Sequence, residues 1–326
     1  MITASIIVPS YNVAATLRET LTALLAQTFS DYEVVIVDDG STDETAEIAE
    51  SFTSDPRVRL VQQRNRGLAG ARNTGIAASK GVLVGFCDAD DIWEPTKLAA
   101  HVSHLQQRPN IGVSYSGSAL IDETGRLTGM AQQPRLKGVT ASHIFKRNPI
   151  GNGSAPVIRR AVFDAIAYRP LREVERDWYF DETFRQSEDI ECWLRIALTT
   201  DWMFEGVEGL LTQYRIASGG LSAATDRQLV AWERMVAKLS TLSPQFFAQH
   251  ASAARSYQLR YLCRRAISDL DAPSAIAFGK LALKTSIQPA FEEPIKSLVT
   301  LVAAVVLQIA GKQTMQKLMM LKGARG

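Results

Sequence analysis

The sequence has few residues of the kinds that form covalent or metal cross-links. It contains three cysteines, Cys87, Cys192 and Cys263, and four histidines in 326 residues. The cysteines lie far apart, and neither residue type follows a zinc-ligand spacing, so we expect no disulfide framework and no zinc site. A reducing compartment, the cytoplasm, is therefore the expected location.

An excess of charge of one sign and a long hydrophobic run are also missing. Lys and Arg number 36 against 34 Asp and Glu, and this near balance gives no general reason to expect nucleic-acid binding. The 46% hydrophobic content excludes a disordered chain. Residues 1–5 carry no basic segment, so we expect no secretory signal.

The apolar stretch Leu298–Ala310 has 13 residues, fewer than the roughly 20 that span a bilayer. Lysines flank it. A helix that lies in the membrane interface through residues 291–326 fits this pattern, as does a core or docking helix with a basic tail. The first alternative would place the protein peripherally at the cytoplasmic face of a membrane.

The first hundred residues alternate between short apolar runs and helical patterns. The runs that predict buried strands cover residues 6–8, 34–37, 58–61 and 82–86. Helices are predicted between them, one of them opened by a capping box of Ser41 and Glu44. Such alternation predicts an α/β fold with a mostly parallel sheet flanked by helices. The pattern is mixed up to about residue 220 and mostly helical afterwards.

Acidic residues follow the second and fourth predicted strands, as Asp38-Asp39 and as Asp88-Ala89-Asp90-Asp91. In a parallel sheet, ligands bind outside the carboxyl ends of the strands. Crowded carboxylates are costly unless a cation or several hydrogen-bond donors lie close to them, and oxygen ligands suit Mg²⁺ or Mn²⁺. A solvated acidic turn that caps the next helix is the alternative.

Glu188-Asp189 opens a later predicted helix. Acidic residues at a helix start are favoured by the helix dipole, which is one explanation. The functional alternative is a general base, with Glu188 raising the proton affinity of the pair.

Five segments together resemble the family 2 glycosyltransferases, the inverting group with the GT-A fold. The segments are residues 7–12, 37–43, 65–75, 88–91 and 187–195. Their order and spacing cover about residues 1–215. The resemblance implies a Rossmann-like GT-A fold with an added C-terminal helical region. It also implies a nucleoside-diphosphate sugar as donor, with uracil as the favoured base.

The resemblance assigns roles to individual residues. Its donor-binding residues correspond to Pro9, Tyr11, Asp39, Arg72 and Asp88. Asp90 would hold Mn²⁺ or Mg²⁺ on the diphosphate, and Asp189 would be the catalytic base. Residues expected on the acceptor side are Trp93, Asn152, Gly153, Glu188 and Trp193. The tryptophans are alternatively core or cleft-wall residues.

The expected activity is transfer of a sugar, with inversion, to a hydroxyl of a glycan or lipid-linked acceptor in envelope polysaccharide synthesis. The alternatives are a nucleotidyltransferase that makes sugar nucleotides and an inactive protein that binds them. The first would need a Gly-rich triphosphate loop after the first strand, where the sequence has Pro9-Ser10-Tyr11-Asn12. We expect a donor half at residues 1–100, an acceptor half at 101–220, a helical extension at 221–290 and an apolar, basic segment at 291–326.

Overall fold

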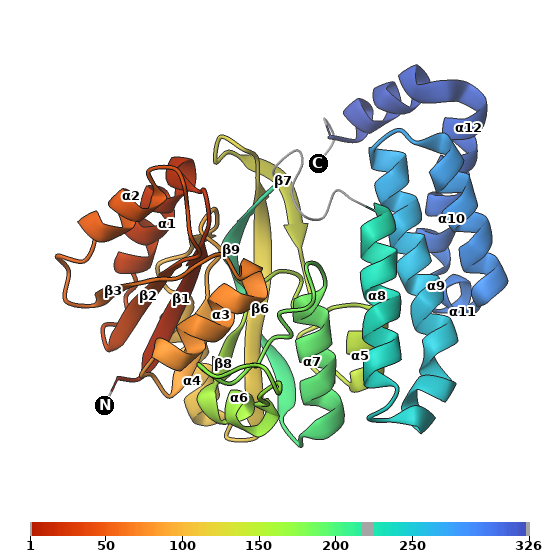
Figure 1. Cartoon of the computed structure of the whole chain (residues 1–326). Coiled ribbons are helices and arrows are strands. Elements are labelled where there is room, and N and C mark those ends of the chain that lie inside the picture. The colour runs from red at the N-terminus through yellow and green to blue at the C-terminus, as the bar shows by residue number, and fades with distance from the viewer. Residues whose placement is uncertain (1, 217–224, 324–326) are drawn as a thin grey trace. The chain divides into compact units, whose positions relative to one another are not determined.

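The computed structural model describes residues 2–216 and 225–323 (Figure 1). The chain divides into two compact units. The sheet unit comprises Met1–Ala141 and Asn148–Ala217, and the helical unit comprises Ser142–Arg147 and Ser218–Gly326. The boundary predicted after residue 220 lies outside the described residues. The finer divisions predicted after residues 100 and 290 stay predictions.

One mixed sheet forms the centre of the sheet unit. Its strands in the described residues are β1 (Ala4–Ser10), β2 (Tyr32–Asp38), β3 (Val58–Gln62), β4 (Leu83–Phe86), β5 (Ile92–Trp93), β6 (Ile111–Ile121), β7 (Leu127–Gln132), β8 (Val157–Arg159) and β9 (Met203–Arg215). The order is β3-β2-β1-β4-β8-β6-β9-β5, with β7 paired to β6. Strands β3, β2, β1 and β4 run parallel, as predicted.

The first two strands are buried along their whole length. Their runs of Val and Ile suit a strand that is covered on both faces, which a parallel sheet requires. Helix α1 (Ala14–Leu25) covers this region with Leu17, Leu21 and Leu24, which join the core cluster of β1 and β2. The register places Ser10 beside Asp38, so the ends of β1 and β2 meet at one edge of the sheet.

The other helices of the sheet unit follow the predicted alternation. They are α2 (Thr45–Ser51), α3 (Gly67–Ala78), α4 (Lys97–Gln107), α6 (Arg160–Ile166) and α7 (Glu188–Thr199). Helix α3 packs against β1 and β2 (Figure 1). Gly75 allows this close packing, because a Cβ there would lie 2.2 Å from Cγ2 of Ile7 in β1.

The predicted capping box at the start of α2 is wrong. The helix begins at Thr45, after Glu44, and neither Ser41 nor Glu44 caps it. The Ser41 hydroxyl instead accepts a hydrogen bond from the Asn12 amide at 3.1 Å, and the Ser41 amide donates to Asp38 Oδ1 at 3.1 Å. These hydrogen bonds connect the loop after β1 to the loop after β2. The Ser41 hydroxyl therefore bonds to a distant residue and does not cap α2.

The helical unit contains helices throughout its described part: α5 (Ala141–Lys146), α8 (Thr225–Leu239), α9 (Pro244–Ser268), α10 (Ala272–Thr285), α11 (Gln288–Glu292) and α12 (Pro294–Gly323). Helices α9 and α10 pack against each other as an antiparallel pair, with Ser256 near Ala282 and Cys263 near Ala275. The connection ends at Asp271, whose carboxylate caps α10 by accepting from the Ser274 amide at 3.2 Å. Helix α5 packs into this unit through Phe145, whose ring stacks on Trp232 with centroids 5.5 Å apart.

Helix α12 is longer than the 13-residue apolar stretch suggests. By length and composition alone, its Pro294–Leu318 part, 25 residues, could cross a membrane. The helix therefore continues on both sides of the 13-residue apolar stretch. Gly311 interrupts it with a φ of 78°, a backbone conformation that glycine adopts without strain.

Candidate functional site

The predicted site residues come from three places in the sheet unit. Asp39 follows β2, Asp88 and Asp90 follow β4, and Glu188 and Asp189 open α7. The strands β1, β2 and β4 are parallel neighbours, so their carboxyl ends share one edge of the sheet. Side-chain contacts then connect the strand ends to α7.

Arg72 on α3 links the two acidic segments. Its Nη2 lies 2.9 Å from Oδ1 of Asp88, and its Nη1 lies 2.8 Å from Oε1 of Glu188. The guanidinium is buried, and it packs near the rings of Phe86 and Phe180 at 5.8 and 5.6 Å. Despite this burial, the carboxylates of Asp88 and Glu188 raise the pKa of Arg72. Arg72 therefore holds the strand end and the helix start together as a fixed cation.

Asp90 and Asp91 have different surroundings although they are adjacent. Asp91 is fully buried, and its carboxylate accepts from the Arg215 amide at 2.9 Å and from the Ser154 hydroxyl at 2.5 Å. Asp91 is therefore a structural residue. Asp90, in contrast, forms no ion pair with any residue in the described ranges. Burial and the neighbouring Asp88 charge raise the pKa of Asp90 to about 6.

This geometry fits a divalent cation. Asp88 and Asp90 supply two nearby carboxylates, and Mg²⁺ is commonly held by one or two carboxylates together with substrate phosphates. No group of three or more His, Cys, Asp or Glu side chains within residues 2–216 and 225–323 has the arrangement of a complete metal site.

The loop before β8 packs directly against these carboxylates. A Cβ on Gly153 would lie 2.2 Å from Arg72 Nη2 and 2.9 Å from Asp88 Oδ2, so only glycine leaves the pair in place. Asn152 holds the loop by donating to Ser118 Oγ and to Gln132 Oε1, both at 2.9 Å. Its side-chain oxygen accepts from the Ser154 amide at 3.1 Å. Asn152 therefore shapes the loop, and its polar atoms are already used.

Asp189 is the acidic residue of α7 that remains available. Glu188 is ion-paired to Arg72, whereas Asp189 forms no ion pair within the described part of the chain. A long contact of 3.4 Å joins its Oδ2 to Asn148 Nδ2. Burial raises the pKa of the Asp189 carboxyl, although the Arg72 charge lowers it. The arrangement leaves one carboxylate that can accept a proton beside one that is held by an arginine.

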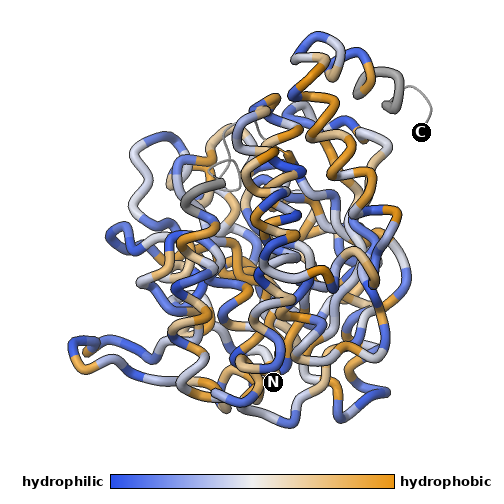
Figure 2. The backbone as a smooth tube through the Cα atoms, turned by 90° about the vertical axis from the view of Figure 1, so that its right-hand side faces the viewer, coloured by the Kyte–Doolittle hydropathy of each residue, from blue (hydrophilic) through white to orange (hydrophobic). Residues whose placement is uncertain are grey.

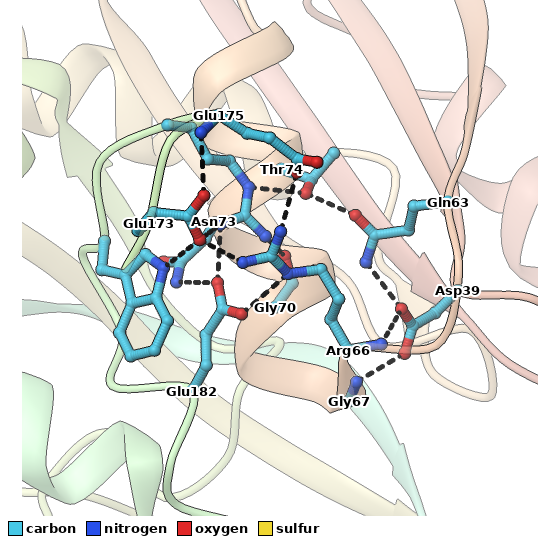
Figure 3. A network of polar contacts seen from close by, with 12 residues as sticks. Asp39, Gln63, Arg66, Gly67, Gly70, Asn73, Thr74, Glu173, Glu175 and Glu182 are labelled. Atoms are coloured by element: carbon cyan, nitrogen blue, oxygen red, sulfur yellow. Dashed lines mark hydrogen bonds and ion pairs between the residues drawn. The ribbon is translucent and has the colours of Figure 1, made fainter. Parts of the chain in front are cut away.

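Asp39 anchors the start of α3 (Figure 3). Its Oδ1 accepts from Gln63 Nε2 at 2.6 Å and from the Arg66 amide at 2.7 Å, and its Oδ2 accepts from the Gly67 amide at 2.8 Å. Asp39 is buried, and three donors already occupy its two oxygens. The structure therefore gives Asp39 an anchoring role, and its contact with a base stays a prediction.

Sequence reasoning missed the acidic loop that surrounds the Arg66 side chain. Its guanidinium forms ion pairs with Glu173, with Glu175 at 2.8 Å and with Glu182 at 2.9 Å (Figure 3). Arg176 adds a second cation, 2.6 Å from Glu182. The density of acidic residues between 173 and 182 was the only available signal. The network fixes this loop over the first turns of α3.

The remaining predicted residues divide by exposure. Tyr11 follows β1 and its side chain is 50% exposed, while Pro9 is buried within the strand. Trp93 and Trp193 are each 1% exposed, so they support the site from within the core and present no surface to an acceptor. The interpretation of these tryptophans as acceptor contacts is corrected accordingly. The Trp93 indole N–H donates to the Ser154 carbonyl at 3.0 Å, which holds the same loop.

Sequence comparison finds that this chain is similar to known glycosyltransferases. WfgD of Escherichia coli, named a UDP-Glc:alpha-D-GlcNAc-diphosphoundecaprenol beta-1,3-glucosyltransferase, is 28% identical over 226 residues, 69% of this chain and 81% of that protein. The uncharacterized glycosyltransferase EpsJ of Bacillus subtilis is 50% identical over 88 residues, 27% of this chain and 26% of that protein. The uncharacterized glycosyltransferase alr2836 of Nostoc is 38% identical over 146 residues, 44% of this chain and 45% of that protein. The chain thus matches less than half the length of EpsJ and alr2836.

Solved structures match in fold. S. aureus TarS 1–349 in complex with UDP-GlcNAc has a TM-score of 0.61 and 17% identity, over 95% of this chain and 93% of that chain. PcManGT, a mannosyltransferase of Pyrobaculum calidifontis in complex with GDP-Man and Mn²⁺, has a TM-score of 0.56 and 22% identity. The match covers 95% of this chain and 88% of that chain. These likenesses confirm the predicted GT-A fold with C-terminal helices. Residues 5–167, half of the chain, match the family described as Glycosyl transferase family 2. The chain therefore belongs to glycosyl transferase family 2.

Proposed function

We propose that this protein is an inverting glycosyltransferase that uses a nucleoside-diphosphate sugar. One observation carries the proposal: Arg72 holds Asp88 and Glu188 together, so the acidic strand end and the start of α7 form one site. The intact acidic residues speak against an inactive binding protein. The loop after β1 spans only residues 11–13 before α1 begins, which leaves no room for a nucleotidyltransferase triphosphate loop.

The residues have separate roles in the proposed reaction. Asp39 accepts a base N–H, with uracil favoured, and Tyr11 lies against the base. Asp189 removes the proton of an acceptor hydroxyl as the oxygen attacks the anomeric carbon from the face opposite the leaving group. The bond from the anomeric carbon to the phosphate oxygen breaks, and the nucleoside diphosphate leaves with the electron pair. General-base help of this kind commonly contributes about 10²–10⁴-fold.

Asp90, with Asp88, would hold Mn²⁺ or Mg²⁺. The cation, when bound, would neutralise the negative charge that develops on the diphosphate. Two observations support this part: the Asp90 carboxylate forms no ion pair within the described residues, and burial and Asp88 raise its pKa although the Arg215 charge lowers it. PcManGT, which shares the fold, forms a complex with GDP-Man and Mn²⁺, which is consistent with this part.

The name of WfgD supports the choice of donor and acceptor class. It specifies a UDP-sugar and an acceptor on a diphosphate-linked lipid. We propose the same classes here, a UDP-sugar and a hydroxyl of a glycan or lipid-linked acceptor, in the synthesis of a cell-envelope polysaccharide at the cytoplasmic face of the membrane.

Two measurements test the proposal. Calorimetry with UDP, GDP and dTDP, each with and without Mn²⁺, should detect Mn²⁺-dependent binding of one nucleotide that Asp90→Asn weakens at least about tenfold. Asp189→Asn should bind that nucleotide normally but lose at least about 100-fold in turnover of a UDP-sugar panel with a synthetic GlcNAc-diphospholipid. The exposed Asp164→Asn is the matched control for both variants. Wild-type turnover by Asp189→Asn would remove the assigned base.

A further inference from the structure

Helix α12 exposes a continuous row of large apolar side chains. We define the α12 stripe as Ile295, Leu298, Val299, Val302, Val305 and Ile309, which are between 47% and 81% exposed. Their spacing of three and four residues places them on one face of the helix before Gly311. Phe291 on the preceding α11 is also 77% exposed. Figure 2 shows the corresponding hydrophobic run in the helix that leads to the more polar last segment near the C-terminus.

The opposite face of α12 belongs to the core of the helical unit. Ala304, Leu307 and Met315 join the apolar cluster formed with α9 and α10. Two buried polar residues lie on this face as well, and the Ser297 hydroxyl accepts from Arg260 Nη1 at 2.6 Å. The helix is therefore anchored through one face, and the stripe is a second face that its own unit does not cover.

The charge around the stripe is positive. No acidic residue occurs between residues 294 and 318, and Lys296, Lys312 and Lys317 are exposed there. The acidic side chains nearest in the sequence, Glu292 and Glu293, are ion-paired, with Lys146 at 2.8 Å and with Arg147, Arg260 and Lys296. At the start of α10, Asp271 lies close enough to Lys312 for the lysine charge to lower the pKa of its carboxyl. The whole helical unit carries 16 Lys and Arg against 6 Asp and Glu, a net charge of +10 in a chain whose total is +2.

We propose that the α12 stripe docks the helical unit onto an anionic membrane surface, with α12 lying in the interface. Apolar side chains enter the boundary between headgroups and acyl chains, while the flanking lysines meet anionic headgroups. This inference does not depend on the proposed transfer reaction, because it uses only residues of the helical unit.

Two alternative explanations of the exposed α12 stripe, a transmembrane helix and a dimer interface, agree less well with the structure. A transmembrane position would need α12 to leave α9 and α10, and the 17 residues from Pro294 to Ala310 reach only about 25 Å at 1.5 Å per residue, less than the roughly 30 Å hydrocarbon core. A second copy of the chain would bring Lys296, Lys312 and Lys317 of two positively charged faces together. An anionic bilayer has the opposite charge and accepts the apolar side chains.

Vesicle binding of the full-length protein provides the first test. The probe is a set of vesicles of phosphatidylcholine alone or with 30% phosphatidylglycerol, used in sedimentation assays. We expect binding to the anionic vesicles, and a loss of at least about tenfold in Leu298→Ser/Val302→Ser/Ile309→Ser. Val230→Ser/Leu242→Ser, at exposed apolar positions of the same unit, is the matched control and should bind normally. Circular dichroism and unfolding midpoints verify that all variants fold.

The lysines are tested separately. Lys312→Gln/Lys317→Gln should weaken binding to the anionic vesicles by about 25-fold, since each lysine near an anionic surface contributes about five-fold. Lys80→Gln/Lys137→Gln makes the same change in total charge at exposed positions of the sheet unit and should have no comparable effect. Equal binding of both double variants and the wild type would overturn the role of the lysines.

A fluorescent label on the α12 stripe distinguishes binding at the membrane interface from insertion across the bilayer and from dimer formation. Cys87, Cys192 and Cys263 are all buried, so Val302→Cys can be labelled selectively with an environment-sensitive dye. We expect a blue shift with anionic vesicles and stronger quenching by lipids brominated near the headgroup than by lipids brominated near the chain end. Labelled Val230→Cys should not shift. Stronger deep quenching would indicate insertion across the bilayer and overturn the proposal. A dimer that the triple serine variant converts to a monomer, without vesicle binding by the wild type, would also overturn it.

Discussion

Asp88 and Glu188, which lie far apart in the sequence, share one buried guanidinium. Each carboxylate takes one terminal nitrogen of Arg72, at 2.9 and 2.8 Å. A planar fork can bridge two carboxylates in this way, whereas an ammonium acts as a single point charge. The distance between the end of β4 and the start of α7 is therefore set by the size of one side chain.

Removal of this guanidinium should destabilise the protein and disrupt the site. Arg72→Gln leaves the buried Glu188 and the partly buried Asp88 without their cation, and we expect a loss of about 3–5 kcal/mol in the free energy of unfolding. Arg72→Lys keeps the charge but can reach only one of the two carboxylates. Its nucleotide affinity should therefore fall, while its free energy of unfolding should decrease less than that of Arg72→Gln. Urea unfolding and calorimetry measure the two effects, with the exposed Arg126→Gln as control. An unchanged unfolding midpoint for Arg72→Gln would contradict the pairing.

Gly153 should not tolerate even a methyl group. Because the new Cβ would approach Arg72 Nη2 to 2.2 Å and Asp88 Oδ2 to 2.9 Å, Gly153→Ala must displace the ion pair or the loop. We expect nucleotide affinity to fall at least about tenfold while the secondary structure is kept. Gly279→Ala is a suitable control, since its Cβ would meet the flexible end of Leu301 at 3.3 Å and Cys263 Sγ at 3.6 Å. An alanine in the middle of α10 should even stabilise slightly, by about 0.5–1 kcal/mol.

Acid should weaken the loop that contains Glu173. Burial alone would raise the pKa of Glu173, but the Glu175 amide, the Trp178 indole and the Arg66 guanidinium lower it to about 2. A lowered carboxyl pKa contributes stability that is fully present above the ordinary value of 4.5 and is lost as the pH falls toward 2. Glu173→Gln should therefore lose stability at pH 7, by about 1–3 kcal/mol, and show a smaller decline between pH 5 and pH 3. Unfolding curves across this range measure it, and the exposed Glu50→Gln should behave like the wild type.

A hydroxyl between two imidazoles fixes their tautomers. Ser114 Oγ lies 2.7 Å from His101 Nδ1 and 2.8 Å from His104 Nδ1, and His104 Nε2 lies 3.1 Å from Glu205. With Nε2–H of His104 donating to Glu205, its Nδ1 accepts from Ser114, and the hydroxyl oxygen accepts from Nδ1–H of His101. Burial lowers the pKa of His101, which keeps that ring neutral. Nitrogen NMR should find the proton on Nδ1 in His101 and on Nε2 in His104.

Two serines on β6 form a matched pair for the same network. Ser114→Ala leaves buried imidazole nitrogens without partners and should cost about 1–3 kcal/mol. Ser116 is also buried, but its hydroxyl has no partner within the described ranges, so Ser116→Ala should be neutral or stabilising. Denaturant unfolding compares them directly. Equal losses in the two variants would mean that the hydrogen bonds of Ser114 contribute nothing.

The sequence predicted much of the sheet unit, because each strand there is specified locally. Runs such as Val34–Val37 are apolar throughout, and the acidic residues that follow them mark the strand ends. The predicted roles of side chains were less accurate wherever a side chain bonds to a residue that is distant in the sequence. Ser41 looked like a helix cap but bonds to the loop after β1, and Arg72 looked like part of a binding loop but bridges two acidic segments. No local pattern encodes such choices.

The acidic loop and the buried tryptophans show the same limit. Glu173, Glu175 and Glu182 have no periodicity, and only the folded chain reveals that they surround Arg66. Trp93 and Trp193 were predicted on the acceptor side, but the sequence gives no information on which side of the backbone their rings pack. Whether Asp90 and Asp189 act as proposed stays a prediction until the variants are measured.

The short helix α5 limits how this protein can be recombined. The chain enters the helical unit at Ser142, leaves it at Arg147 and enters it again at Ser218. Phe145, 3% exposed, packs there against Trp232, Phe246 and Phe247. A fragment that ends near residue 217 would therefore expose an aromatic helix in the middle of its sequence. A chimaera that exchanges residues 218–326 must exchange residues 142–147 as well, because the helical unit is built from two separate segments of the chain.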